Sequence, residues 1–509
     1  MFLPTLPYGG GKTARQTVTF GGVRYGRGGG DGELSESLNL STLQFPALSQ
    51  RPPRTQAGSW NSPTALFGRG KLCVVDGSAL LYDGETVGTV TPGEKQMAAV
   101  NTKIVLWPDK KYYDTAQKTF GDLGASVTAA AASFTESTLT LPGQNLEAAF
   151  APDQALDISG ASLPENNRSL VLRAVSGDTL TFYAGSFTPG SSATPVTVER
   201  KIPDLKLICE SNNRLWGCDD TTIWASALGD PLTWYNYDGL STDSFAVSVG
   251  SDGAFTGCCA YGSGVLFWKE DLLHKVMGLQ PSEYQLYTYT VQGPKAGCHK
   301  SLQVINEVLY YLGAEGVYAY AGGTPALISE NFGTRRFRDA AAGTDGSRYY
   351  LSMADAATGA WGLWTYDPQR AVWLREDDTH ALDFTLLDGE LLFLAGKTAW
   401  RVGQTGGAAD DDLPWSALFY PMDETLHNKK GASRLLLRLE LAPGAWVRAE
   451  LREDDGPWRR WGTLHGQRRR SAVLTLLPGR CDTLQLRLSG SGRCVVKSLI
   501  REFVLGSEV

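Results

Sequence analysis

Histidine is scarce in this sequence, and the cysteines follow no metal-binding pattern. The chain has 509 residues but only five histidines, and no two of them have the spacing of a metal site. The eight cysteines form no CxxC pair, so we expect free thiols buried in strands. With so few histidines, few side chains are suited to act as a general acid or base near neutral pH. The sequence therefore predicts a protein that is not an enzyme, with no catalytic residues, no metal and no cofactor.

An excess of basic residues and long apolar runs are also absent. Asp and Glu outnumber Lys and Arg by 54 to 47, whereas a protein that grips nucleic acid carries a basic face. A mildly acidic wall could still surround DNA, because it would repel the phosphates and let the duplex slide. No stretch approaches the roughly 18 apolar residues of a membrane span. The N-terminus lacks the apolar core of a signal peptide, so we expect synthesis in a cytoplasm and no membrane span.

Glycine and aromatic residues are plentiful. The chain contains 58 Gly, 20 Tyr and 14 Trp. Aromatic side chains favour strands, and glycine favours the tight turns between strands. The length suggests two to four domains at roughly 150 residues each. We therefore expect an all-β protein of several domains.

A loose repeat runs through most of the chain. Each unit has an apolar strand, a small polar turn and a strand rich in Tyr or Trp, as in NRLWGCDDTTIWAS, EVLYYLGAEGVYAY and GELLFLAGKTAWRV. Asp76-Gly77 and Asp83-Gly84 are hairpin signals in the first unit. A period of about 40 residues is typical of propeller blades. We predict a β-propeller of about seven blades, with six or eight as alternatives, over residues 59–118 and 204–404. Stacked β-sandwich domains are the competing interpretation.

Three further segments are expected around the propeller. Residues 1–58 resemble an extended arm that ends at a double proline and is expected to lie on another surface. Residues 119–203 are expected to form an inserted small β-barrel or sandwich, since loop tips tolerate insertions. Residues 413–509 contain cleanly alternating strands and predict a C-terminal β-sandwich.

Several short motifs could carry chemistry, but each has a simpler explanation. GGGKT at residues 9–13 lacks the strand and helix of a phosphate loop, and GRGGGDG at residues 26–32 lies in no βαβ unit. The acidic runs could suggest glycosidase carboxylates or a Ca²⁺ site. We expect them to lie in turns or linkers, where aspartate is common; they are Asp219-Asp220, Glu376-Asp377-Asp378 and Asp410-Asp411-Asp412.

One basic and aromatic cluster is a candidate interface. It is expected on turns of the last domain, and Trp together with Arg often anchors protein interfaces. A solvated loop face and contact with DNA phosphates are the alternatives. Its members are Trp458, Arg459, Arg460, Trp461, Arg468, Arg469 and Arg470.

The N-terminal arm resembles the start of tail nozzle and hub proteins of short-tailed bacteriophages. The resemblance is carried by a Gly-Val phrase, an acidic-polar segment with an Asn, an apolar-Pro phrase and a basic residue before prolines. The matching residues are Gly22, Val23, Glu36, Asn39, Leu40, Pro46, Arg51, Pro52 and Pro53. The phrases at residues 158–160 and 166–167 also look like small β-domains inserted in phage tail proteins. The resemblance implies a ring of identical subunits, commonly six, around a channel that retains and then passes genomic DNA.

The resulting expectation is a structural component of a virion tail. Its partners would be copies of itself, other tail or adaptor proteins and double-stranded DNA that passes without sequence-specific binding. The alternative is a propeller that binds or cleaves glycans, with a pocket aromatic such as Trp224 or Trp268. A cellular scaffold propeller is a third interpretation.

Overall fold

The protein is all-β throughout the residues that its computed structural model describes. These are residues 12–26, 29–403, 413–423, 429–466, 471–475 and 479–505, and their only helical segments are short 3-10 turns. The chain divides into two compact units. Unit 1 comprises residues 1–59, 315–319 and 326–509, and unit 2 comprises residues 60–314 and 320–325.

Four-stranded sheets follow one another along unit 2. In each sheet the strands are antiparallel and their spatial order is the order of the sequence. The first two sheets are β6 (Pro63–Arg69), β7 (Lys71–Asp76), β8 (Ala79–Tyr82) and β9 (Glu85–Thr89), and β10 (Gln96–Val100), β11 (Lys103–Trp107), β12 (Lys111–Asp114) and β13 (Thr119–Asp122). The next two are β23 (Leu207–Ser211), β24 (Arg214–Cys218), β25 (Thr222–Ala225) and β26 (Phe245–Ser248), and β27 (Gly257–Tyr261), β28 (Gly264–Trp268), β29 (Leu272–Met277) and β30 (Gln285–Thr290).

Three more sheets of the same kind follow. They are β31 (Gln303–Ile305), β32 (Val308–Leu312), β33 (Val317–Tyr320) and β34 (Ala326–Leu327); β35 (Phe337–Thr344), β36 (Tyr349–Asp355), β37 (Trp361–Asp367) and β38 (Val372–Asp377); and β39 (Ala381–Leu387), β40 (Glu390–Ala395) and β41 (Thr398–Arg401). The last sheet takes its fourth strand from the N-terminal segment, because β5 (Thr55–Ser59) pairs with β41.

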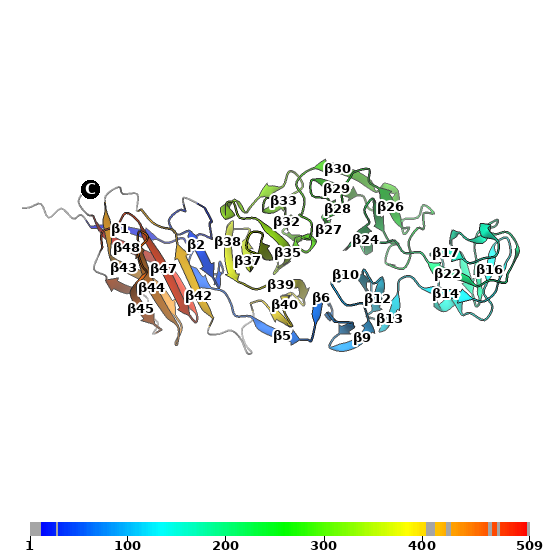
Figure 1. Ribbon diagram of the computed structural model, residues 1–509, viewed down its shortest axis with the longest axis horizontal. Helices are drawn as coiled ribbons and strands as arrows, with labels where there is room; N and C mark the ends of the chain where they lie inside the picture. The colour runs from blue at the N-terminus through cyan, green and yellow to red at the C-terminus, as the bar shows by residue number, and fades with distance from the viewer. Residues whose placement is uncertain are drawn as a thin grey trace, which may run out of the picture. The chain divides into compact units, whose positions relative to one another are not determined.

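This succession of four-stranded antiparallel sheets is that of a β-propeller, as the repeat predicts (Figure 1). Apolar residues of one blade pack on those of the next, as Val75 and Leu80 do with Ile104 and Leu106. The turn signals are also confirmed. Gly77 adopts φ +60° between β7 and β8, and Asp83 and Gly84 have φ of 55° and 82° between β8 and β9.

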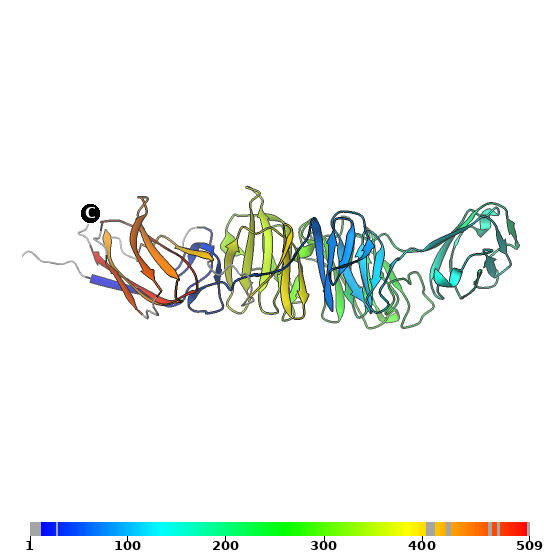
Figure 2. The same ribbon diagram turned by 90° about the horizontal axis from the view of Figure 1, so that it is seen from below.

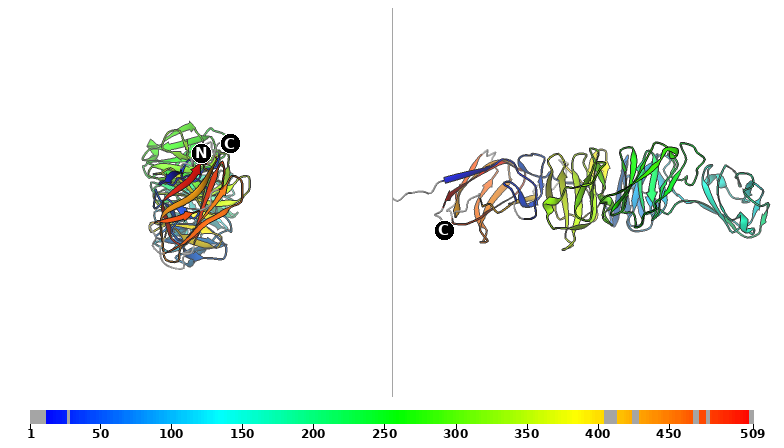
Figure 3. Two further views of the ribbon diagram at one scale, coloured as in Figure 1. Left: turned by 90° about the vertical axis from the view of Figure 1, so that its left-hand side faces the viewer. Right: turned by 90° about the horizontal axis from the view of Figure 1, so that it is seen from above.

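A separate small β-domain lies between β13 and β23. It has two sheets, seen in cyan in Figure 3, that enclose a core containing Phe134, Phe182 and Phe187. Thr119–Asp122 pairs with β12, so these residues complete a blade and precede the insert. The strands of the insert are β14 (Ser126–Ala129), β15 (Ala132–Phe134), β16 (Thr138–Thr140), β17 (Ala155–Ser159), β18 (Ser169–Val171), β19 (Ala174–Ser176), β20 (Thr179–Thr181), β21 (Gly190–Ser192) and β22 (Val196–Arg200).

The C-terminal domain has two sheets, and the N-terminal segment contributes to both. One sheet has the order β2-β42-β47-β44-β45, and the other has the order β3-β4-β48-β43-β46 with β1 also paired to β48 (Figure 2). The N-terminal strands are β1 (Lys12–Thr17), β2 (Leu34–Leu38), β3 (Leu40–Ser41) and β4 (Leu48–Gln50). The others are β42 (Pro414–Phe419), β43 (Lys430–Leu441), β44 (Trp446–Glu453), β45 (Arg459–His465), β46 (Ala472–Thr475), β47 (Leu484–Ser491) and β48 (Cys494–Leu505).

The segment expected to be an extended arm is therefore built into the rest of its own chain. We call residues 12–59 the arm. Its strands β1 to β4 extend the two sheets of the C-terminal domain, and β5 completes the last propeller blade. Sequence patterns within residues 413–509 could not show this, because the missing strands lie at the other end of the sequence.

Candidate interaction surfaces

A buried cluster of charges fixes the arm to strand β38. Arg54 donates to Glu376 at 2.6 Å and to Asp377 at 2.7 Å, and its guanidinium lies 5.0 Å from the ring centre of Phe393. Burial alone would raise the pKa of Asp377, but Arg54 and hydrogen bonds from Thr379 lower it. The expectation that Glu376 and Asp377 occupy a turn is wrong. They end a strand, and Glu376 is buried with 4% of its surface exposed, because Arg54 compensates its charge.

The residues that carry the phage resemblance lie at this same junction. Val23 donates its backbone N–H to the carbonyl of Trp373 at 2.7 Å, and Asn39 donates its own to the carbonyl of Glu376 at 2.6 Å. The side chain of Asn39 donates to the Pro414 carbonyl at 2.8 Å and accepts from Arg51 at 2.8 Å. Asn39 has φ 54°, a conformation that Asn tolerates better than most residues. These residues therefore position the arm against both β38 and the C-terminal domain.

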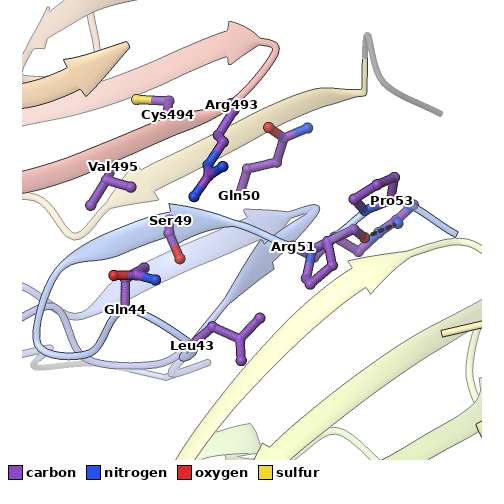
Figure 4. Close-up of a pocket in the computed structure, with 10 residues that line it drawn as sticks. Leu43, Gln44, Ser49, Gln50, Arg51, Pro53, Arg493, Cys494 and Val495 are labelled. Atoms are coloured by element: carbon purple, nitrogen blue, oxygen red, sulfur yellow. Dashed lines mark hydrogen bonds between the residues drawn. The ribbon is translucent and has the colours of Figure 1, made fainter. Parts of the chain in front are cut away.

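A small pocket lies where the β3–β4 hairpin joins β48. Figure 4 shows Leu43 and Gln44 of the hairpin on one side and Arg493, Cys494 and Val495 on the other. Its volume is about 350 Å³. Arg51 lines it, but its guanidinium already donates to Asn39 and to the carbonyl of Pro52 at 2.9 Å. We interpret the pocket as a hollow in the seam between arm and domain.

A larger cleft of about 1010 Å³ opens elsewhere in unit 1. The arm contributes Tyr25 and Glu36 to its lining, and the blade β35–β38 contributes Trp361 and Trp364. The ring of Trp361 stacks on His380 with centroids 3.5 Å apart and an angle of 16° between the planes. Tyr25 meets Trp364 edge-on at 5.9 Å. Aromatic side chains of both the arm and the blade thus line the cleft.

Charged side chains of both signs line this cleft. The guanidinium of Arg335 lies 3.6 Å from the ring centre of Tyr25, and Arg375 forms an ion pair with Asp378. Asp355 accepts backbone hydrogen bonds from Ala357 and Thr358, each at 2.9 Å. These bonds lower the pKa of Asp355 despite some opposing effect of burial. The carboxylate therefore stays charged at neutral pH.

This cleft could not be predicted from the sequence. Its residues come from separate stretches of the chain, which include Tyr25, Glu36, Thr334, Asp355, Trp361 and Arg375. Each stretch reads as an ordinary strand end or turn. No local spacing could have shown that they meet.

The structure describes only part of the predicted interface cluster. Arg459, Arg460 and Trp461 lie on strand β45, so the expectation that they occupy turns is wrong. Trp461 points into the domain core with 7% of its surface exposed. Arg460 is exposed, and Arg459 pairs with Glu453 at 2.9 Å. Arg468, Arg469 and Arg470 lie outside the described residues.

Trp458 stands on the outer side of the five-stranded sheet, among arginines. The guanidinium of Arg487 lies 4.5 Å from its ring centre, and that of Arg452 lies 5.2 Å away. A similar contact at 5.3 Å joins Arg448 to Trp446 on the same sheet. Alternating Trp and Arg side chains thus cover part of this face. Such residues are enriched in protein interfaces.

The other candidate side chains have structural roles. Trp268 is completely buried in its blade, and Trp224 packs on Tyr235 at 4.9 Å while it donates to Asp219 at 3.0 Å. Neither tryptophan lines a pocket described here. Asp219 also accepts from the backbone of Thr221, which is a turn contact of the kind expected. The run Asp410–Asp412 lies outside the described residues, as does most of residues 9–13.

Two features are absent from the part of the chain that the structure describes. Within the described residues, no three His, Cys, Asp or Glu side chains are grouped so that they could hold a metal ion. No helix in that part of the chain is long and apolar enough to cross a membrane.

The chain is similar to known proteins only remotely. No family model and no curated protein matches it. An exo-β-1,3-galactanase from Phanerochaete chrysosporium aligns over 57% of this chain and 92% of its own, with 9% identity and a TM-score of 0.23. Hsv2 from Kluyveromyces lactis aligns over 62% and 98%, with 10% identity and a TM-score of 0.29. The extracellular domain of a protein assigned to a hybrid two-component system of B. thetaiotaomicron aligns over 86% and 58%, with 9% identity and a TM-score of 0.40.

Proposed function

We propose that the chain is a structural component of a bacteriophage tail, in a nozzle or hub ring around the channel that retains and then passes genomic DNA. The observation that supports this is the place of the motif residues. Gly22, Val23, Asn39, Leu40 and Arg51 are among the residues through which the arm docks in unit 1. The resemblance therefore coincides with a structural element that a tail protein of this family would need.

The interlocked arm also suits a part that bears mechanical load. Strands at the start of the chain pair with strands at its end, as β1 does with β48 over six residue pairs. Pulling either terminus must break main-chain hydrogen bonds of a sheet before the domain can open. A net charge of −7 suits a wall that DNA passes without sticking.

The test is the assembly state of the full-length chain and its presence in particles. We expect mass photometry and negative-stain electron microscopy to show a closed ring of identical subunits at micromolar concentration. Mass spectrometry of phage particles from the same source should detect the chain in tail fractions. A monomer at high concentration, together with absence from the particles, would overturn the proposal.

A second candidate function is glycan binding at the propeller. The observation that favours it is the 1010 Å³ cleft, with aromatic rings from two sides and polar side chains at its rim. Concave sites that combine aromatic surface with a few directed polar groups are typical of small-ligand sites. A glycan array probed with the labelled full-length chain tests this function. The absence of any bound glycan would remove it.

A further inference from the structure

We infer that the cleft between the arm and blade β35–β38 binds a neutral oligosaccharide. This inference rests on the second candidate function and assigns it a site, a ligand class and binding residues. The ligand would lie against Trp361, with Glu36 of the arm and Arg335 of the blade side as its polar contacts. All three residues line the cleft.

The aromatic side chains suit the apolar face of a sugar ring. A sugar presents C–H groups on its faces and hydroxyls around its edge, so it packs flat on an aromatic ring. Trp361 is only half-buried, and its stacking on His380 holds the ring in one orientation. A ring that is already fixed loses little conformational entropy on binding. Trp361 is therefore the residue on which we expect a sugar to stack.

The charges indicate a ligand without net charge. The lining has three arginines, Arg335, Arg336 and Arg375, and three carboxylates, Glu36, Asp355 and Asp378. A polyanion would meet the carboxylates, and a polycation would meet the guanidinium groups. Sugar hydroxyls both donate and accept, so they can use both kinds of side chain.

Contacts within the protein already orient several of these groups. Arg336 pairs with Glu315 at 2.5 Å, Arg375 pairs with Asp378, and Asp355 is held by its turn. Arg335 is held over Tyr25 and forms no ion pair with a carboxylate in the described part of the chain. Glu36, on the arm, is exposed. Arg335 and Glu36 are thus a donor and an acceptor that remain available to the ligand.

Binding at this place would also couple to the arm. Tyr25 and Glu36 belong to the arm, whereas Trp361 belongs to the blade. A ligand that contacts both walls binds the docked arrangement only, so it stabilises docking by mass action. Occupancy of the cleft should therefore protect the arm from local opening.

The experiment measures binding of neutral and acidic oligosaccharides to the full-length chain on an array, followed by calorimetry with the best neutral binder. Trp361→Ala should weaken binding at least 10-fold. Glu36→Gln, an exposed change that leaves the fold intact, should weaken it several-fold. Trp446→Ala, which removes a half-buried tryptophan of the C-terminal domain, should leave the affinity unchanged. Hydrogen exchange should slow at residues 22–38 when the ligand is bound.

The outcomes distinguish failure of this inference from failure of the second candidate function, on which it rests. If only acidic glycans bind, the neutral ligand class is wrong but glycan binding stands. If neutral glycans bind equally well to the wild type, Trp361→Ala and Glu36→Gln, the site is wrong. If no glycan binds at millimolar concentration, both the inference and the second candidate function fail.

Discussion

Arg54 and Glu376 form a salt bridge at 2.6 Å although they are 322 positions apart in the sequence. Both are almost fully buried, with 6% and 4% of their surfaces exposed. The second carboxylate oxygen of Glu376 accepts a hydrogen bond from Thr365 at 2.8 Å. The pair thus joins the arm to β38 in a place where neither charge could be left alone.

Removing Arg54 should therefore destabilise the protein strongly. Arg54→Ala removes the closer of the two cations at the buried Glu376 and leaves only Arg51, at 3.8 Å. Breaking a buried ion pair in this way typically costs about 3–5 kcal/mol. Lys497→Ala is the matched control, because Lys497 and Glu440 are paired at 2.5 Å but both are more than half exposed. The control should cost less than about 1 kcal/mol. Urea unfolding measures both, and equal costs for the two variants would show that the buried pair does not hold the arm.

Gly22 should tolerate no side chain. A Cβ at this position would lie 2.4 Å from the carbonyl oxygen of Trp373 and 2.8 Å from its nitrogen. Gly22→Ala must push the arm away from β38, at a cost of about 1–3 kcal/mol. Gly250→Ala is the control, because a Cβ there meets nothing within 4 Å. We expect faster proteolytic cleavage within residues 12–59 of Gly22→Ala alone; a resistant arm in that variant would contradict the docking described here.

The protein should lose stability as the pH falls below about 6.5. Burial, and secondarily the charge of Lys269, lower the pKa of His274 from its ordinary value of 6.5. His274 lies between the hydroxyls of Ser251 at 2.8 Å and Thr288 at 2.9 Å, which suit the neutral ring. The contribution of neutral His274 to stability is fully present above pH 6.5. It is lost as the pH falls through the lowered pKa, and the free energy of unfolding then decreases by up to about 1.4 kcal/mol per pH unit.

Urea midpoints at pH 7.5 and pH 5.0 test this effect of His274. His274→Gln keeps polar contacts but cannot titrate, so its midpoint should change less with pH than that of the wild type. His380 and His299 also have lowered pKa values and will leave some pH dependence in the variant. An identical pH dependence in the two proteins would show that His274 is not responsible.

The cysteines should react slowly in the folded protein. None of the eight forms a disulfide, and burial raises the pKa of Cys73, Cys481 and Cys494 to about 12. Thiolate is the reactive form, so almost none is present at pH 7.5. A disulfide exchange reagent should label fewer than one thiol per chain in minutes, and all eight after unfolding. Fast labelling of several thiols in the native state would contradict the burial.

The outer face of the C-terminal domain should serve in assembly rather than in stability. Arg460→Glu reverses a charge on an exposed side chain beside the Trp458 cluster. We expect it to weaken self-association or binding of a tail partner at least 10-fold, while the unfolding midpoint changes little. Arg434→Glu on the other sheet of the domain is the control. If Arg460→Glu associates as strongly as the wild type, this surface is exposed to solvent and is not an interface.

Much of the fold could be predicted from local pattern. Asp76-Gly77 and Asp83-Gly84 predicted hairpins, because few residues accept positive φ. Strand pairs with aromatic residues, such as those of NRLWGCDDTTIWAS, recur at the spacing of propeller blades. The candidate sites were less predictable. The pairing of Arg54 with Glu376, the burial of Trp461 and the meeting of Tyr25 with Trp364 depend on which distant segments adjoin.

The sequence by itself determined the class of the fold, because alternation of apolar and polar residues and the placement of glycine act over a few residues. Only the tertiary structure decided that β1 to β4 complete the C-terminal sheets, that β5 completes a blade and that a cleft forms beside β2. Edge strands pair through main-chain hydrogen bonds, and every residue except proline can form these bonds. The side chains of an edge strand therefore say little about which strand it pairs with. The partner of each edge is chosen by packing of the whole domain.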